Sequence, residues 1–162
     1  MEEDFKDFNL TYNNPEAVVL GDMGNLFTFE ILNKIFELIL NGAELIAMHK
    51  NKYWNSSSGI KLDLGAFVSA LEFSSGKKAV VMGKPNPYLF NLAIHSWNIS
   101  KDLIYVVGDD IESDIVGACN SGMKSILVKT GKFIEENLVS SSIKPDYIIN
   151  SINDLNKIIK LK

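Results

Sequence analysis

The stretch LIYVVGDDIESD, Leu103 to Asp114, joins the most strand-like run of the chain to a cluster of acids. An unbroken apolar run that ends at a glycine is typical of a buried strand in a parallel sheet. Asp109 and Asp110 follow at once, with Glu112 close behind. Parallel α/β sheets bind their ligands beyond the carboxyl ends of strands. The stretch therefore predicts both a parallel sheet and a site at its edge.

Four carboxylates within six residues repel one another unless a partner lies between them. A divalent cation is one such partner, and carboxylate oxygens suit Mg²⁺. The alternative is that acids favour the first turn of a helix, where the helix dipole stabilises them. That alternative explains Glu112 and Asp114 well and the adjacent Asp109 and Asp110 poorly. Both interpretations remain open from the spacing alone.

Short apolar runs alternate with amphipathic segments from about residue 17 onward. The pattern predicts strands at 17–21, 44–48, 78–83, 103–108, 125–129 and 147–150, and helices at 28–41, 65–76, 88–97 and 111–120. Pro85 is expected to open the helix at 88–97, and Ser151 with Asp154 to begin a final helix. Polar loops are predicted at 49–59 and 130–145. This alternation predicts an α/β fold with a mainly parallel sheet covered by helices.

Two further strand ends carry polar residues. Lys84 follows Gly83 where a strand gives way to a helix, a place from which a lysine can neutralise a phosphate or a carboxylate. A solvated surface lysine is the plainer alternative. Asp22 follows the strand at 17–21, but Gly24 stands where a second carboxylate would act as a general acid. Asp22 is therefore predicted to shape a turn.

The composition restricts the classes of function. Apolar residues make up 46% of the 162 residues, which is enough for a packed core. The net charge of −4, with all 16 basic residues being lysine, argues against a nucleic-acid-binding protein. No apolar run reaches the length of a membrane span, so no membrane partner is expected. A single cysteine, Cys119, excludes an internal disulfide; it is expected to be buried, in a protein of the cytoplasm.

Three stretches together resemble a known family: GKPNPYLF (83–90), VVGDDIESDIVGA (106–118) and GMKSILVKTGK (122–132). They look like the latter part of haloacid dehalogenase (HAD) superfamily phosphatases, and most of all like the NagD-like and phospholysine phosphohistidine inorganic pyrophosphate phosphatase-like subgroup. The resemblance implies that residues 1–82 are the second half of an α/β cap domain. It also implies that residues 83–162 are the C-terminal part of a core with a Rossmann-like parallel sheet.

The resemblance implies a Mg²⁺-dependent phosphatase that acts on a small phosphorylated substrate through an aspartyl-phosphate. Lys84 matches the family's lysine, which neutralises the nucleophile and the phosphate, with Gly83 beside it at the substrate. Asp109 matches the acid that completes the Mg²⁺ shell. Asp110 and Asp114 fall where outer-shell or secondary acids lie. Such a site needs the cation to offset the charge of carboxylates and phosphate together.

A polar loop in the cap-like half is expected to screen substrates. It contains His49, Lys50, Asn51, Lys52 and Tyr53. The lysines would attract an anionic leaving group, and the aromatic ring would stack on it. The alternative is a surface loop with an aromatic anchor, because fold analogy alone carries little weight for function.

The sequence departs from the family at its catalytic centre. The DxDGT motif and the Ser/Thr motif are missing, and no D-x-D occurs in the chain, so it contains no nucleophile and is expected to be inactive alone. Three explanations compete: a fragment of a longer product, a natural short form without catalysis, or a homodimer whose second copy covers the open sheet edge. The first is favoured. A non-catalytic HAD-like oligomeric scaffold is the main alternative function; the cap-like half argues against a receiver-like phosphoacceptor domain.

Overall fold

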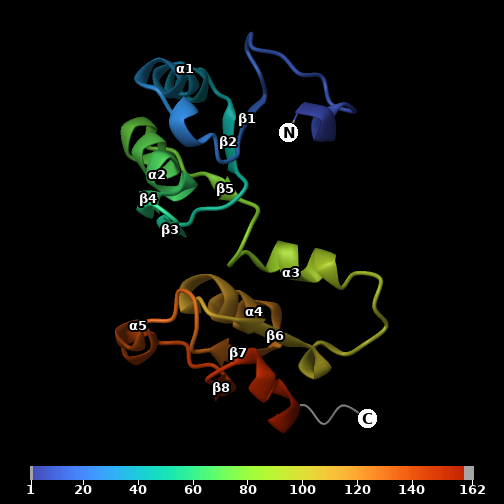
Figure 1. Ribbon diagram of the computed structural model, residues 1–162. Coiled ribbons are helices and arrows are strands. Elements are labelled where there is room, and N and C mark those ends of the chain that lie inside the picture. The colour runs from blue at the N-terminus through green and yellow to red at the C-terminus, as the bar shows by residue number, and fades with distance from the viewer. Residues whose placement is uncertain (1, 159–162) are drawn as a thin grey trace. The chain divides into compact units, whose positions relative to one another are not determined.

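The computed structural model describes residues 2–158, which form two compact units, one up to Met82 and one from Gly83 onward. Each unit contains a three-stranded parallel sheet with helices packed on it (Figure 1). The predicted α/β class is therefore confirmed. The helices of the described residues are too short or too polar to cross a membrane.

The first unit is built on strands β1 (Ala17–Leu20), β2 (Glu44–Ala47) and β5 (Val80–Val81), in the order β1-β2-β5. Val19 pairs with Ile46, and Ile46 with Val80. Helices α1 (Phe29–Leu40) and α2 (Leu64–Ser75) lie side by side on one side of this sheet (Figure 1). Thr28 caps α1 by accepting a hydrogen bond from the Ile31 amide at 3.3 Å. Short 3-10 turns span Glu2–Phe5 and Gly24–Leu26.

The core of the first unit lies between the sheet and the two helices. Its apolar residues recur at helical spacing in α1 and α2 and at alternate positions in β2, which is why these segments form the elements they do. Burying them supplies the main favourable free energy of this unit. The buried residues are Leu20, Leu45 and Ala47 from the strands, Ile35 and Ile39 from α1, and Leu64, Val68 and Leu71 from α2.

An antiparallel hairpin, β3 (Tyr53–Ser56) and β4 (Gly59–Leu62), replaces the second half of the predicted loop at 49–59. That prediction was wrong because both strands are largely exposed and lack the alternation that marks a half-buried strand. The turn closes where the Ser56 hydroxyl donates to the Gly59 carbonyl at 2.7 Å. The hairpin therefore rests on turn chemistry more than on burial.

The second unit is built on strands β6 (Tyr105–Gly108), β7 (Lys124–Val128) and β8 (Tyr147–Ile149), all parallel and in that order. Within the described residues β6 pairs with β7 alone, so its other edge is open. The helices are α3 (Pro87–Ala93), α4 (Val116–Ser121) and α5 (Glu135–Ser140). A π-helical turn, Ile111–Ile115, leads into α4, and 3-10 turns span Lys101–Leu103 and Ile152–Lys157.

Both faces of the second sheet are covered. On one face, apolar side chains from α3, the π-helical turn and the strands pack in two clusters: Phe90, Ile104 and Met123, then Ile111, Ile115 and Leu127. On the other face the strand residues Ile126, Val128 and Ile149 pack with Leu155 and Ile158. Adjacent strand residues such as Ile126 and Leu127 thus point to opposite covered faces, which explains why these strands read as continuous apolar runs.

Several boundaries differ from prediction. Helix α3 begins at Pro87 and ends at Ala93, because Asn86 is its cap and accepts from the Tyr88 amide at 2.9 Å. Pro85 therefore lies before the helix. Helix α5 lies inside the predicted loop at 130–145; it buries no residue and so leaves no periodic apolar signal. Cys119 is exposed rather than buried.

The last predicted helix is a 3-10 turn over Ile152–Lys157, and residues 159–162 lie outside the described part of the chain. The capping box that opens it is confirmed. Ser151 and Asp154 each accept a hydrogen bond from the other end of the box.

Candidate active site

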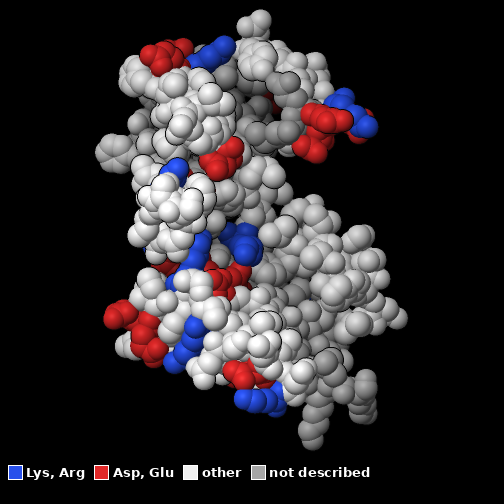
Figure 2. Space-filling model, viewed as in Figure 1, with Lys and Arg blue, Asp and Glu red and all other residues white. Residues whose placement is uncertain are grey.

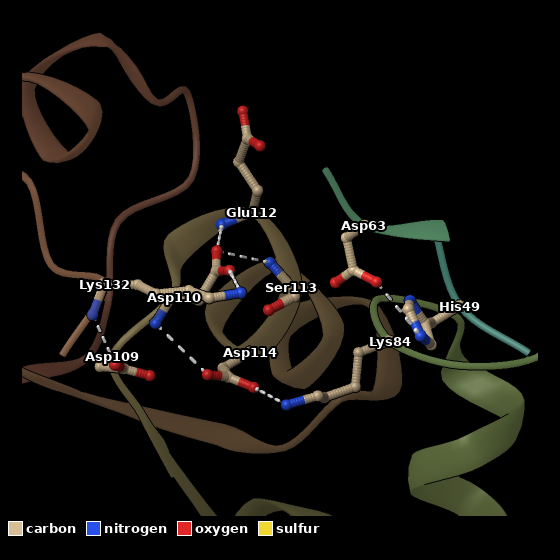
Figure 3. Close-up of polar contacts among 9 residues, drawn as sticks. All are labelled: His49, Asp63, Lys84, Asp109, Asp110, Glu112, Ser113, Asp114 and Lys132. Atoms are coloured by element: carbon tan, nitrogen blue, oxygen red, sulfur yellow. Dashed lines mark hydrogen bonds and ion pairs between the residues drawn. The ribbon is translucent and has the colours of Figure 1, made fainter. Parts of the chain in front are cut away.

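Unit 2 gathers the predicted acids and Lys84 at the carboxyl end of β6 (Figure 3). Asp114 lies at the centre of the group, with only 9% of its side chain exposed. Its Oδ1 accepts a hydrogen bond from Lys84 Nζ at 2.6 Å, and its Oδ2 accepts from the Asp110 amide at 3.3 Å. The Lys84 side chain is 47% exposed, so the ammonium remains open to a ligand. The buried acid thus joins a half-exposed lysine to the end of the strand.

Two features of the backbone let Asp114 reach this place. A Cβ at Gly108 would overlap the Asp114 carboxylate, so only glycine lets the strand end lie against it. The π-helical turn then widens the chain, because both Asp114 and Ile115 donate their amides to the Asp110 carbonyl, at 2.8 and 3.3 Å. Single π-helical turns of this kind are rare and often occur at functional sites.

Asp110 caps this turn. Its Oδ1 accepts from the amides of Glu112 and Ser113, at 3.0 and 3.2 Å. Its Oδ2 lies 3.8 Å from the ammonium of Lys132. Both oxygens therefore have partners within the chain. The helix-start explanation suggested by the sequence for Glu112 and Asp114 thus applies to Asp110 instead.

Asp109 points to the turn that follows β7. Its Oδ2 accepts a hydrogen bond from the Lys132 amide at 2.7 Å. A Cβ at Gly131 would overlap the same oxygen, so the carboxylate lies in a recess that any side chain there would fill. The other oxygen, Oδ1, has no hydrogen-bond partner among the described residues. Asp109 therefore has one oxygen held and one available.

The family implies a Mg²⁺ ion, and the donor set tests how well one fits. Within residues 2–158 no three His, Cys, Asp or Glu side chains are arranged to hold a metal ion. Asp110 and Asp114 are engaged by backbone amides and lysines, which leaves Asp109 as the acid with a free oxygen. Mg²⁺ commonly takes only one or two carboxylates and fills its octahedron with waters and phosphate oxygens. Asp109 thus fits as a single ligand.

Unit 1 holds the predicted substrate loop against the start of α2. The Asn51 carbonyl accepts from the Gly65 amide at 2.9 Å, and the Lys52 carbonyl from the Asp63 amide at 3.2 Å. Tyr53 begins β3, opposite Leu62. The main chain of the loop is therefore fixed by α2.

His49 lies beside Asp63 in the same loop (Figure 3). Its Nε2 is 3.7 Å from Asp63 Oδ1, and its Nδ1 is buried with no hydrogen-bond partner among the described residues. Asp63 also accepts from the Leu64 amide at 2.7 Å and so caps α2. The imidazole thus combines a carboxylate on one side with an unsatisfied nitrogen on the other.

Lys50 has a structural partner, the buried carboxylate of Glu72, at 2.7 Å. Glu72 also accepts from the Ala79 amide at 3.0 Å and lies 3.5 Å from Lys78. Burial would raise the pKa of Glu72, but the hydrogen bonds from Lys50 and Ala79, with the charges of both lysines, hold that pKa below its ordinary value. Lys50 therefore ties the loop to α2 and to the segment that precedes β5.

Asp22 accepts from the Gly24 amide at 2.9 Å, as expected of a turn aspartate. The sequence gave no reason to pair Gly131 and Lys132 with Asp109; its one signal was TGK directly after a strand. In both units lysines lie beside acids on the face in view, rather than in a broad area of one charge (Figure 2).

Comparisons with known proteins agree with this architecture. The family model described as HAD-hyrolase-like matches residues 81–155. Haloacid dehalogenase-like hydrolase domain-containing protein 2 of Bos taurus is 42% identical over 130 residues, which are 80% of this chain and 49% of that protein. Phospholysine phosphohistidine inorganic pyrophosphate phosphatase of Mus musculus is 36% identical over 135 residues, or 82% and 49%. The chain spans about half the length of these curated relatives.

Solved structures give the same result. The 4-nitrophenylphosphatase of Thermotoga maritima matches with a TM-score of 0.85 at 31% identity, over 96% of this chain and 60% of that one. NagD of E. coli matches with a TM-score of 0.79 at 26% identity, over 93% and 59%. The fold and the strand-end acids define an α/β protein with its site at the carboxyl edge of a parallel sheet. The chain belongs to the haloacid dehalogenase superfamily, among its NagD-like members.

Proposed function

We propose that this chain carries half of the site of a Mg²⁺-dependent phosphatase that acts on small phosphorylated molecules in the cytoplasm. The observation that carries the proposal is the group of Lys84, Asp114 and Asp109 at the end of β6. A cationic lysine and a carboxylate with a free oxygen are the groups that phosphoryl transfer requires in one place. Relatives named as phosphatases support the same activity.

Each residue of the second unit has a role in this proposal. Asp109 binds the cation through Oδ1. The ammonium of Lys84 neutralises charge on the phosphoryl oxygens and on the attacking carboxylate, while Asp114 holds that ammonium in place. Mg²⁺, when bound, offsets the charge of phosphate and carboxylates. Gly83, just before Lys84, leaves the backbone open to the substrate.

The attacking group has to come from elsewhere, because the sequence contains no D-x-D. In the proposed reaction an aspartate forms a bond to phosphorus, the ester P–O bond breaks, and a second carboxylic acid gives its proton to the leaving oxygen. We place the strand that carries these two acids on the open edge of β6. The 162-residue chain alone is then inactive, and an uncovered edge favours pairing with a second copy.

In the first unit, we assign substrate contact to His49, Asn51, Lys52 and Tyr53. His49 supports this role best, because its ring offers an unsatisfied nitrogen. Lys50 supports them indirectly, since its ammonium is held by Glu72. A non-catalytic scaffold is the second candidate, and the missing D-x-D favours it.

The test is an assay with p-nitrophenyl phosphate. Three samples are compared: this chain, a fusion that places the amino-terminal half of the Bos taurus relative before it, and the same fusion with Asp109→Asn. Only the first fusion should hydrolyse the ester; EDTA should abolish turnover, and Asp109→Asn should lower it by about 100-fold or more. A folded fusion that is inactive, or equally active with Asp109→Asn, favours the scaffold.

A further inference from the structure

We propose that the turn Thr130–Phe133 is a positioning element that fixes the Asp109 carboxylate; the inference rests on the proposed function, in which Asp109 is a cation ligand. The turn follows β7 and closes where the Phe133 amide donates to the Thr130 carbonyl at 3.0 Å. Between these residues, the Lys132 amide donates to Asp109 Oδ2 at 2.7 Å. The turn thus joins the ends of β6 and β7 through a charge-assisted hydrogen bond.

Gly131 is the residue that makes this contact possible. Its φ of +56° lies in the left-handed region, which other residues rarely adopt. Its missing side chain also leaves the space that Asp109 Oδ2 occupies. Conformation and space therefore both require glycine here. Any side chain at this position would push the carboxylate away from the Lys132 amide.

The side chain of Lys132 extends the same device to the neighbouring acid. Its ammonium lies 3.8 Å from Asp110 Oδ2, so one residue contacts Asp109 through its amide and Asp110 through its side chain. With Oδ2 occupied, Asp109 presents Oδ1 as its free ligand atom. A ligand held in one rotamer loses less conformational entropy when the cation binds. The turn thereby prepares Asp109 for the cation.

The direct test is the χ1 rotamer of Asp109, measured by three-bond carbon–nitrogen and carbon–carbon couplings in the labelled full chain. The parent chain and Lys132→Ala, which keeps the amide, should show one staggered rotamer. Gly131→Ala should show averaging between rotamers. Gly122→Ala is the matched control, because Gly122 is also left-handed, at φ +76°, but its added Cβ would meet only Lys101, at 4.0 Å. Gly122→Ala should leave the couplings unchanged.

A second readout does not depend on Gly131→Ala folding. Exchange of the Lys132 amide should accelerate about tenfold or more in Asp109→Ala, since a hydrogen bond to a charged acceptor is lost. Averaged couplings in the parent, one rotamer in Gly131→Ala, or unchanged exchange would each overturn the inference. Added Mn²⁺ separates the two proposals. If the couplings are as expected and Mn²⁺ broadens no signal near Asp109, the positioning role stands and the cation role falls.

Discussion

Lys84 Nζ and Asp114 Oδ1 lie 2.6 Å apart and link two segments thirty residues apart at the carboxyl end of β6. Asp114 is nearly buried, whereas about half of the Lys84 side chain is exposed. The pair thus has a structural end and an accessible end. A lysine whose position is set by a buried acid can meet an incoming phosphate without first being ordered, which lowers the entropic cost of binding.

Replacing Lys84 with methionine should destabilise the second unit by about 1–2 kcal/mol. Asp114 would lose its cation while remaining buried, and the figure is reduced because Lys84 is half exposed. Lys157→Met is the matched control, since Lys157 and Asp154 also lie 2.6 Å apart but the lysine is 78% exposed. The control should change stability by less than about 0.5 kcal/mol. Urea unfolding followed by amide NMR signals of residues 83–158 measures both; equal losses would contradict the structural role of the pair.

Asp110 is expected to act as a helix cap and not as a cation ligand. Asp110→Ala should cost about 1 kcal/mol, because the amides of Glu112 and Ser113 lose their acceptor. Asp110→Ser should recover most of the loss, since serine also caps helices. Mn²⁺-induced broadening at Asp109 should persist in Asp110→Ser. Broadening that disappears while stability is recovered would identify Asp110 as a ligand instead.

The first unit should lose stability in acid through Glu72. Its pKa is held below the ordinary value in the folded chain, so its contribution is complete above that ordinary value and is lost as the pH falls through the folded pKa. Unfolding midpoints in urea should therefore fall between about pH 5 and about pH 3. Glu72→Gln should flatten this dependence and lower stability at neutral pH by about 1–3 kcal/mol. An unchanged slope in Glu72→Gln would rule out this source.

The two lysines around Glu72 should differ in effect. Lys50 lies 2.7 Å from the carboxylate with 32% of its side chain exposed, whereas Lys78 lies at 3.5 Å and is 87% exposed. Lys50→Met should therefore destabilise the first unit by about 1 kcal/mol, and Lys78→Met by a few tenths at most. Urea titration of the two variants at neutral pH measures the difference. The opposite order would show that Lys50 is not the main partner.

The strands and helices that the sequence predicted are those with buried, periodic faces. The run at 103–108 and the run at 125–129 were recognisable because both faces of their sheet are covered. The hairpin β3–β4 and helix α5 were missed because they bury almost nothing and so impose no period on the sequence. Local cues at caps were more reliable, as Ser151 shows.

The candidate site was predictable in membership but not in wiring. Asp109 and Lys84 follow strand ends, which the sequence reveals. That Asp114 pairs with Lys84, and that the Lys132 amide holds Asp109, depends on contacts 30 and 23 residues apart along the chain. Such contacts follow from the register of β6 against β7 and from the π-helical turn, and neither leaves a mark in local sequence. The role of Lys50 was hidden for the same reason, since Glu72 lies 22 residues away.

Paramagnetic broadening by Mn²⁺ in the labelled 162-residue chain tests the cation site most directly. Amide signals of Gly108, Asp109 and Lys132 should broaden first as Mn²⁺ is added, excess Mg²⁺ should reverse the effect, and Asp109→Asn should abolish it. No broadening in the parent chain, or broadening that survives in Asp109→Asn, would contradict the assignment of Asp109 as the ligand that this chain contributes.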